Sequence, residues 1–261
     1  MNSVNKTLYI PLYGKALVSR KGLLLRDLKA QEIWQAEGFP LKGKAASKWL
    51  AYYMGMRAAV FDRWLEENLT KMPDALVLHP GCGLDSRCCR VQIRGRGWYD
   101  VDFPQVIAER KKYYEETEDY RMIPADVRQE NWLESIPRGG DALVVMEGLS
   151  MYLDENRRRE LLRQIGEHFD RVHLLLDAYT VFAAKASRYK NPVNEVGVTE
   201  LFGFDDPMVL AEGTGFSFTG ELEMTPGDLI DQLPRKERGI FRLVYAGRMS
   251  KALYRLYSYE K

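Results

Sequence analysis

The sequence is poor in cysteine and histidine and has no long apolar run. Its three cysteines, Cys82, Cys88 and Cys89, are an odd number in one short region, which does not suit a disulfide framework. Together with only three histidines they match no zinc-ligand spacing, so no metal site is expected. The most apolar stretch near the start, residues 49–56, ends at Arg57 and falls far short of the roughly 18 residues that a membrane span needs.

An export signal and a strong net charge are also missing. Lys6 precedes only a short apolar patch, which Pro11 and Lys15 interrupt, so the cytoplasm is the expected location. Basic and acidic residues number 38 and 37, whereas a nucleic-acid partner would require clustered basic surface. What remains is an ordinary globular composition, with 46% apolar and 29% charged residues.

The apolar pattern changes near residue 73. Before it, apolar residues in segments 27–36 and 47–69 recur every three or four positions, which predicts a helical region over residues 1–72. After it, short β-rich runs alternate with helical stretches, which is typical of βαβ units around a parallel sheet. The expected strands are 75–79, 98–102, 121–124, 142–147 and 172–177, and the expected helices are 86–91, 104–115, 154–169 and 180–189.

The pattern is weaker after residue 190. Asn191-Pro192 and the glycines that follow indicate a long connection. Segments 216–224 and 253–259 alternate like strands, and segment 227–250 between them is predicted to be helical. The two strands are expected to pair in antiparallel fashion at the edge of the sheet.

A glycine-rich turn, Gly81-Cys82-Gly83-Leu84-Asp85, directly follows the first expected strand. In an open parallel sheet ligands bind beyond the carboxyl ends of the strands, and glycines there allow close backbone approach. A tight turn without a ligand is the alternative. Asp102, about 20 residues further on, ends the next strand, where an acid can accept hydrogen bonds from ribose hydroxyls. Its alternative role is to cap the helix that begins at Pro104.

Two cofactor classes suit this loop and acid. A nicotinamide dinucleotide would favour a third Gly or Ala where Ser86 stands, because that position packs against a loop that carries pyrophosphate. S-adenosylmethionine has no phosphate and does not need it. Asp126, after the third strand, can accept from an adenine amino group, and its alternative role is that of a loop acid or a cap for the turn that carries Trp132. Glu147 ends the most apolar strand, where a carboxylate is costly to bury without partners and is therefore expected to face a site.

The motifs GCGLDSR (81–87), YDVDFP (99–104) and EGLSMYL (147–153) together resemble the leucine carboxyl methyltransferase family. Within it the chain is most similar to the branch of tetracenomycin-type polyketide-synthesis O-methyltransferases, which IPLYGKA (10–16) and MRAAVFD (56–62) also match. The resemblance implies an α/β, Rossmann-like class I methyltransferase fold with a seven-stranded sheet whose last strand is antiparallel. It also implies an N-terminal helical cap, residues 1–72, on an S-adenosylmethionine-binding domain, residues 73–261.

Carried over position by position, the resemblance assigns the cofactor site. Arg57 would pair with the cofactor carboxylate, Asp102 with the ribose, and Asp126 and Val127 with the adenine. The residues expected to bind the cofactor are Arg57, Gly81, Cys82, Gly83, Asp102, Phe103, Asp126, Val127, Glu147 and Gly148. One departure is His79-Pro80 before the glycines, where His79 is expected to be a hydrogen-bonded residue at the strand end.

The expected activity is methyl transfer from S-adenosylmethionine to a carboxylate or hydroxyl of a small, polyketide-like acceptor. No convincing general base is found, so no catalytic residue is assigned, and this mildly favours a carboxylate acceptor, which needs none. Tyr13 and Tyr152 are expected to contact the acceptor. The alternatives are a nicotinamide-dependent oxidoreductase and a cofactor-binding protein without catalysis. The sequence indicates neither the acceptor nor the oligomeric state.

Overall fold

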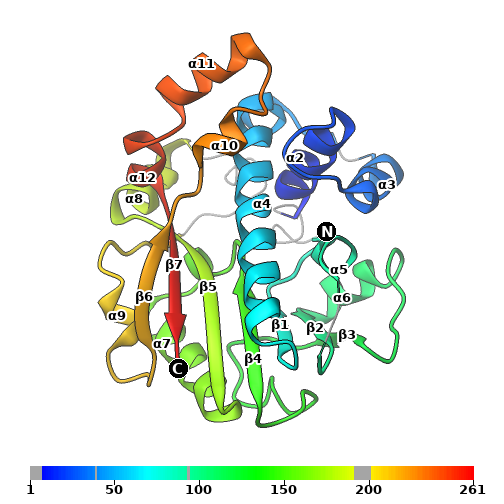
Figure 1. Cartoon of the computed structure of the whole chain (residues 1–261), viewed down its shortest axis with the longest axis vertical. Helices are drawn as coiled ribbons and strands as arrows, with labels where there is room; N and C mark the ends of the chain where they lie inside the picture. Colours follow the sequence, from blue (N-terminus) through cyan, green and yellow to red (C-terminus); the bar gives the residue numbers. More distant parts are fainter. Residues whose placement is uncertain (1–7, 39, 93–94, 191–200) are drawn as a thin grey trace.

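A computed structural model describes residues 8–38, 40–92, 95–190 and 201–261, and its centre is a seven-stranded sheet in the order β3-β2-β1-β4-β5-β7-β6 (Figure 1). The strands are β1 (Leu76–Pro80), β2 (Trp98–Asp102), β3 (Tyr120–Pro124), β4 (Asp141–Met146), β5 (Arg171–Tyr179), β6 (Ser217–Leu222) and β7 (Tyr254–Glu260). Strands β1 to β5 pair in parallel, and β7 runs antiparallel to both β5 and β6. The predicted α/β class I sheet with an antiparallel last strand is confirmed.

Helices precede the first strand and connect the later ones. They are α2 (Tyr9–Arg20), α3 (Leu28–Glu37), α4 (Lys48–Lys71), α5 (Arg87–Arg90), α6 (Pro104–Arg110), α7 (Glu155–His168), α8 (Val181–Lys190), α9 (Met208–Ala211), α10 (Gly227–Ile230), α11 (Arg235–Val244) and α12 (Arg248–Leu253), with 3-10 turns at Gly43–Ala46 and Ser150–Tyr152. Within the described ranges, no helix combines the length and the apolar character that crossing a bilayer requires.

The predicted elements differ from the structure at a few places. Helix α6 ends at Arg110, five residues before the predicted end. The predicted helix 227–250 is three short helices, because Pro234 precedes α11 and Gly247, with φ +58°, separates α11 from α12. Helix α2 was not placed within the helical region. It contains Pro11 in its first turn, where the missing N–H costs nothing. The predicted connection at Asn191-Pro192 lies outside the described residues.

The sheet is covered on both faces, and β4 shows this most clearly. Leu143 and Val145 join the apolar cluster that includes Phe61 of α4, whereas Val144 joins the cluster that includes Ile165 of α7. Successive side chains of a strand point to opposite faces, so a strand buried on both sides must be apolar throughout. This accounts for the unbroken apolar run 142–146.

Helices α2, α3 and α4 are packed together at the carboxyl ends of the parallel strands, and α4 continues along one face of the sheet (Figure 1). Helices α2 and α4 approach closely because each has a glycine at the contact. A Cβ on Gly14 would lie 2.8 Å from the Cβ of Met54, and one on Gly55 would lie 2.9 Å from Val18. This packing holds helices α2 to α4 together over the ends of the strands. We call this layer of helices the cap. The exact division at residue 72 stays a prediction.

Candidate functional site

A cavity of about 790 Å³ lies between the cap and the carboxyl ends of β1 to β4. It is lined by every residue that the sequence predicted to bind the cofactor: Arg57, Gly81, Cys82, Gly83, Asp102, Phe103, Asp126, Val127, Glu147 and Gly148. These residues come from the ends of four strands and from α4, so the fold brings together positions up to 91 residues apart in sequence.

The turn after β1 is shaped by its two glycines. Gly81 and Gly83 have φ values of +71° and +53°, in the left-handed region that other residues rarely adopt. A Cβ on Gly81 would also meet Leu149 at 3.2 Å. Arg110 of α6 holds the turn from behind by donating to the carbonyl oxygens of Gly83 (3.0 Å) and Asp85 (2.6 Å). The turn therefore presents backbone to the cavity in a fixed conformation.

Asp102 ends β2 beside this turn. Its two carboxylate oxygens accept from the backbone N–H of Gly83 and of Phe103, each at 2.8 Å. Burial raises the pKa of Asp102, although both hydrogen bonds oppose the shift. A carboxylate has about four acceptor positions, so two remain for ligand hydroxyls. The alternative role as a helix cap is wrong, because the N-cap of α6 is Phe103 and no side chain caps this end.

Asp126 and Arg128 lie at the end of β3. The guanidinium of Arg128 donates to both carboxylate oxygens of Asp126, at 2.8 and 2.6 Å, and this pairing lowers the pKa of Asp126. The same guanidinium lies 5.4 Å from the centre of the Phe103 ring. Arg128, which the sequence analysis missed, thus orients Asp126 and forms with Phe103 one wall of the cavity. The sequence pattern that could have identified Arg128 is a basic residue two positions after Asp126.

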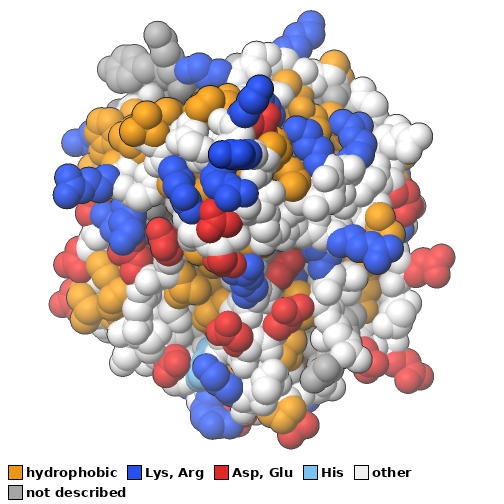
Figure 2. All heavy atoms as spheres, turned by 45° about the horizontal axis from the view of Figure 1, so that its top comes forward, with side chains coloured by type: hydrophobic (Ala, Val, Ile, Leu, Met, Phe, Trp, Pro, Cys, Tyr) orange, Lys and Arg blue, Asp and Glu red, His pale blue; other side chains and the backbone are white. Residues whose placement is uncertain are grey.

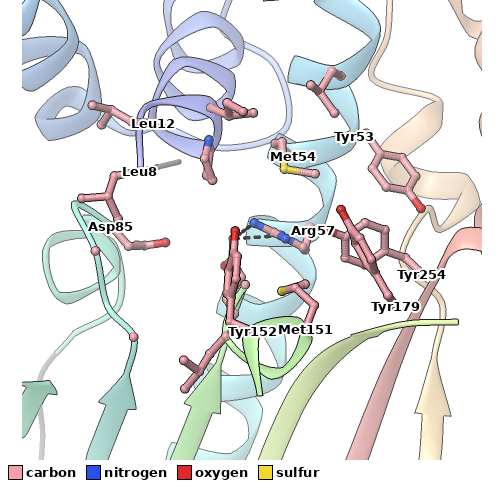
Figure 3. A pocket seen from close by; sticks show the side chains of 18 of the residues that line it. Leu8, Leu12, Tyr53, Met54, Arg57, Asp85, Met151, Tyr152, Tyr179 and Tyr254 are labelled. Atoms are coloured by element: carbon pink, nitrogen blue, oxygen red, sulfur yellow. Dashed lines mark hydrogen bonds and ion pairs between the residues drawn. The ribbon is translucent and has the colours of Figure 1, made fainter. Parts of the chain in front are cut away.

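A buried charge cluster adjoins the cavity, and its central residue, Arg57, points into the space shown in Figure 3. The Arg57 guanidinium donates to Glu147 Oε1 at 3.0 Å and to Asp177 Oδ2 at 2.8 Å, and Glu147 also pairs with Arg87. Burial disfavours the charged form of Glu147, but Arg57 and Arg87 outweigh it and lower its pKa to about 2. For Asp177 the effect of burial is larger than the opposing effect of Arg57, so its pKa is raised to about 6. Asp177 was not predicted, although an acid inside the apolar strand β5 was a signal.

Lys15 of α2 is a second cation that the sequence analysis did not place in the site. It is 2% exposed, lines the cavity, and its Nζ lies 2.5 Å from Asp85 Oδ2. Burial opposes the ionisation of Asp85, yet Lys15 together with Arg87 and Arg90 holds its pKa well below the usual range. Lysine has three N–H donors, so among the described lining residues the buried cations Lys15 and Arg57 could also reach a ligand carboxylate.

Ser86, at the position of the third fingerprint glycine, has a structural role. Its hydroxyl lies 2.6 Å from both carboxylate oxygens of Asp27, which also caps α3 by accepting from Ala30 N. The residue that departs from the dinucleotide fingerprint therefore fastens the cap to the glycine turn. His79 pairs with Asp100 at 3.1 Å, as predicted for a hydrogen-bonded residue at the strand end, and it also lines the cavity.

The rest of the cavity is aromatic and aliphatic. Figure 3 shows Tyr53, Tyr179 and Tyr254 grouped on one side of Arg57, and Asp85 on the other. The ring centres of Tyr179 and Tyr254 are 4.6 Å apart. The apolar and aromatic residues that line the cavity include Trp49, Leu50, Tyr53, Met54, Met151, Tyr152, Tyr179, Ala183, Val244, Tyr245, Met249, Leu253 and Tyr254. Such a chamber suits a mostly apolar ligand.

The two predicted acceptor contacts are placed differently. Tyr152 lines the cavity (Figure 3). Tyr13 is not among the described lining residues. Its hydroxyl donates to Ala46 O at 3.1 Å, and its ring packs 5.0 Å from that of Trp34. Tyr13 thus lies within the cap, because the helical turn that brings Leu12 and Lys15 to the cavity rotates Tyr13 away from it.

Comparisons with known proteins give a consistent result. The family model for leucine carboxyl methyltransferase matches residues 3–166. The tetracenomycin polyketide synthesis O-methyltransferase TcmP of Streptomyces glaucescens is 34% identical over 212 residues, covering 80% of this chain and 78% of that protein. The S-adenosyl-L-methionine-dependent methyltransferase dpfgK of Gibberella zeae is 33% identical over 135 residues, 48% of this chain and 45% of that protein.

Solved structures show the same fold. Magnesium protoporphyrin IX methyltransferase (ChlM) of Synechocystis PCC 6803, with SAH bound, superposes with a TM-score of 0.55 at 12% identity, over 88% of this chain and 93% of that one. An S-adenosylmethionine-dependent methyltransferase of Mesorhizobium loti gives 0.52 at 12% identity, over 77% and 98%. At these identities the likeness concerns the fold alone.

Proposed function

The chain belongs to the leucine carboxyl methyltransferase family, and from this premise we propose that it methylates a carboxylate or hydroxyl oxygen of a small, polyketide-like molecule. It is an S-adenosylmethionine-dependent methyltransferase, and the bound cofactor supplies an activated methyl group on a positively charged sulfur. The relative TcmP acts in tetracenomycin polyketide synthesis, as its name states, which supports a comparable acceptor here.

The observation that carries the proposal is the convergence of the glycine turn, Asp102, Asp126 and Glu147 on one cavity. This set of groups fits a nucleoside without phosphates. Asp102 and Asp126 offer acceptors suited to ribose hydroxyls and an adenine amino group, whereas the position that a pyrophosphate loop reserves for glycine is filled by Ser86. The comparisons lend no support to the nicotinamide-dependent or the non-catalytic alternative.

We assign the remaining roles within this proposal. Gly81, Cys82 and Gly83 line the methionine part of the cofactor, Val127 meets the adenine, and Glu147 with Gly148 lies on the methionine and ribose side. Arg57 or Lys15 pairs with the cofactor carboxylate, since both are buried cations on the cavity wall.

The chain's own residues must align the acceptor oxygen with the methyl group of the cofactor and exclude water from the site. Tyr53, Tyr179 and Tyr254 form the wall of the cavity beside Arg57, and Tyr152 contacts the acceptor. Burial raises the pKa of the Tyr53 phenol, whose hydroxyl also pairs with Ser250 Oγ at 2.9 Å, so it is a poor base. His168 and His173 bond Ile136 O and Asn68 and do not line the cavity in the described part of the chain. An acceptor already ionised at neutral pH, such as a carboxylate, fits this arrangement best.

Two measurements test the proposal. Calorimetric titration with S-adenosylmethionine, S-adenosylhomocysteine and NAD should show binding of the first two, and tight binding of NAD alone would overturn it. Transfer of labelled methyl to a panel of carboxylic acids and phenols should show carboxylates as the better acceptors, and transfer to neither class would contradict O-methylation of a small molecule. A cytoplasmic location also stays a prediction.

Asp102→Asn tests the cofactor site directly. Loss of the charged acceptor should weaken S-adenosylhomocysteine binding by about 1.5–3 kcal/mol, or roughly 10- to 150-fold in Kd. The loss should disappear with 2′,3′-dideoxyadenosine, which has no ribose hydroxyls to donate. Asp141→Asn, which removes a half-buried partner of the exposed Arg171, is the matched control and should leave both affinities unchanged. Equal weakening of both ligands by Asp102→Asn would remove the ribose role.

A further inference from the structure

The helices α11 and α12 carry apolar side chains on their outer side. Leu243 is 81% exposed, Met249 52% and Ile240 49%, and Val244 and Leu253 are also exposed. These five residues are called the apolar ridge below. In α11 only Phe241 is buried, and it packs on Tyr52 and Tyr245. Figure 1 shows α11 at the far end of the molecule from the carboxyl terminus, projecting beyond α4.

The ridge follows the helical repeat. Lys236, Ile240 and Leu243 are spaced i, i+4 and i+7, so they share one face of α11, and Arg242 lies at the side of that face. A surface helix ordinarily turns its apolar stripe to the core and its charges to water. Here apolar side chains point outward and basic side chains flank them, an arrangement typical of helices that lie in the interface of a membrane.

Basic residues are concentrated on the same segment. Residues 235–253 contain six basic residues and one acid, although the whole chain has a net charge of only +1. Within the described ranges Arg235, Lys236, Arg248 and Lys251 form no ion pair. Figure 2, which brings this end of the molecule forward, shows hydrophobic side chains lying beside lysine and arginine side chains. The segment therefore complements a surface that is apolar inside and negatively charged outside.

The ridge is also continuous with the cavity. Val244, Met249 and Leu253 are exposed and at the same time line the apolar side of the cavity. Whatever covers the ridge thus lies next to the entrance of the chamber.

We propose that the apolar ridge and its basic flank bind the surface of an anionic lipid membrane, so that a lipid-soluble acceptor can pass directly into the cavity. Only the second clause rests on the proposed function. The contact is peripheral, with Leu243 and its neighbours reaching the boundary between headgroups and acyl chains and the basic residues pairing with lipid phosphates.

Other occupants fit less well. A symmetric dimer through this face would set the same basic residues against one another, which is unfavourable. The residues that dominate protein–protein binding are enriched in Trp and Tyr, whereas the five residues of the ridge are all aliphatic.

Flotation of the full-length protein with vesicles tests the proposal. Vesicles of equal parts phosphatidylglycerol and phosphatidylcholine should carry the protein, and vesicles of phosphatidylcholine alone should carry at least about ten-fold less. Leu243→Glu should weaken binding about ten-fold or more, because a buried leucine is lost. Raising the salt from 0.1 to 1 M shortens the screening length from about 10 to about 3 Å and should also release the protein.

The matched control is Leu28→Glu on α3, which removes another apolar residue that is 58% exposed. It should leave vesicle binding unchanged, and both variants should bind S-adenosylhomocysteine like the wild type, which shows that they are folded. Absence of binding to anionic vesicles, equal binding to neutral ones, or an equal loss in Leu28→Glu would each overturn the proposal. So would a dimer or a complex with an acidic protein that Leu243→Glu abolishes while vesicle binding persists. Methyl transfer in vesicle-free solution tests the proposed function separately.

Discussion

Arg57 shows how one residue can link folding and ligand binding. Its guanidinium connects the cap helix α4 to Glu147 after β4 and to Asp177 in β5, and all three side chains are at least 91% buried. A buried ion pair contributes little net stability compared with apolar residues, but removal of one partner leaves a charge without compensation. The same residue was predicted from the family resemblance to pair with the cofactor carboxylate, so its two roles must be separated by experiment.

Arg57→Met should lower the free energy of unfolding by about 3–5 kcal/mol, because two buried carboxylates lose their shared cation. Urea unfolding measures this change. If Arg57 also binds the cofactor carboxylate, affinity for S-adenosylhomocysteine should fall more than affinity for adenosine, which lacks that group. Equal losses for both ligands would leave Arg57 with the structural role alone, and an unchanged unfolding free energy would contradict that structural role.

The carboxyl groups around Arg57 also predict how stability depends on pH. Glu147 has a folded pKa of about 2 against an ordinary 4.5, so the unfolded chain binds more protons between these values, and the contribution of Glu147 is lost as the pH falls through that window. The pKa of Asp177 is raised from 3.8 to about 6, so its effect on stability has the opposite sign. The stability that Asp177 contributes is lost as the pH rises from about 4 to 6. Below pH 4 the Glu147 effect dominates.

Urea unfolding at a series of pH values should therefore show stability falling steadily between pH 4 and 2.5. Glu147→Gln should be less stable at pH 4.5 and should show a shallower decline, because the group that takes up the proton is gone. A decline as steep as that of the wild type would assign the acid sensitivity to other buried acids, such as Asp85 and Asp100, whose pKa values are also lowered.

At the scale of elements, several polar links attach the cap to the sheet and its turns, and Ser86 to Asp27 is one of them. Ser86→Ala should lower the free energy of unfolding by about 1.5–3 kcal/mol, the usual contribution of a buried hydrogen bond to a charged group. Amide hydrogen exchange should become faster in α3, whose first turn Asp27 caps, before it does so in β4. Ser217→Ala, in the exposed edge strand β6, is the control and should change neither quantity. Unchanged exchange in α3 would show that the cap does not depend on this link.

The central strands could be predicted because their signal is local. Strand β2 was predicted at its observed bounds, and the apolar run of β4 was placed within a residue at each end, since burial on both faces requires apolar side chains at every position. Strands β6 and β7 were also found, and their antiparallel pairing is confirmed. The place of β7 between β5 and β6 could not be predicted, because strand order depends on contacts between distant segments.

The site was predictable to the same degree and for the same reason. Asp102 and Glu147 were found because each ends a recognisable strand, and the glycine turn fixes where the strands converge. Lys15 and Asp85 were missed as a pair because they are 70 residues apart and meet only when the cap closes over the sheet. Tyr13 was assigned to the acceptor because a tyrosine can help orient a hydroxyl, but which face of α2 it occupies depends on how the cap is packed.

At the scale of the whole molecule, the cavity lies between two groups of elements that meet around it. The end proposed to hold the nucleoside is formed by strand ends, and the opposite end by the cap together with α8, α11 and α12. A ligand that spans both ends must therefore stabilise both, because it binds the folded chain and not the unfolded one. This coupling distinguishes the cofactor from fragments that occupy the nucleoside end alone.

S-adenosylhomocysteine at 100 times its Kd should add about 2.7 kcal/mol to the free energy of unfolding, which corresponds to a rise in Tm of roughly 5–10 °C for a chain of this size. Thermal unfolding followed by circular dichroism measures the shift, and hydrogen exchange should show protection in α2 as well as in the turn after β1. Adenosine at the same multiple of its own Kd should raise Tm similarly but protect the turn more than α2, since it lacks the amino-acid part that would reach Lys15 or Arg57. NAD at the concentration used for S-adenosylhomocysteine should give no shift. Equal protection of α2 by adenosine would mean that the cap closes over the nucleoside itself, and a rise with NAD would contradict a site built for a nucleoside without phosphates.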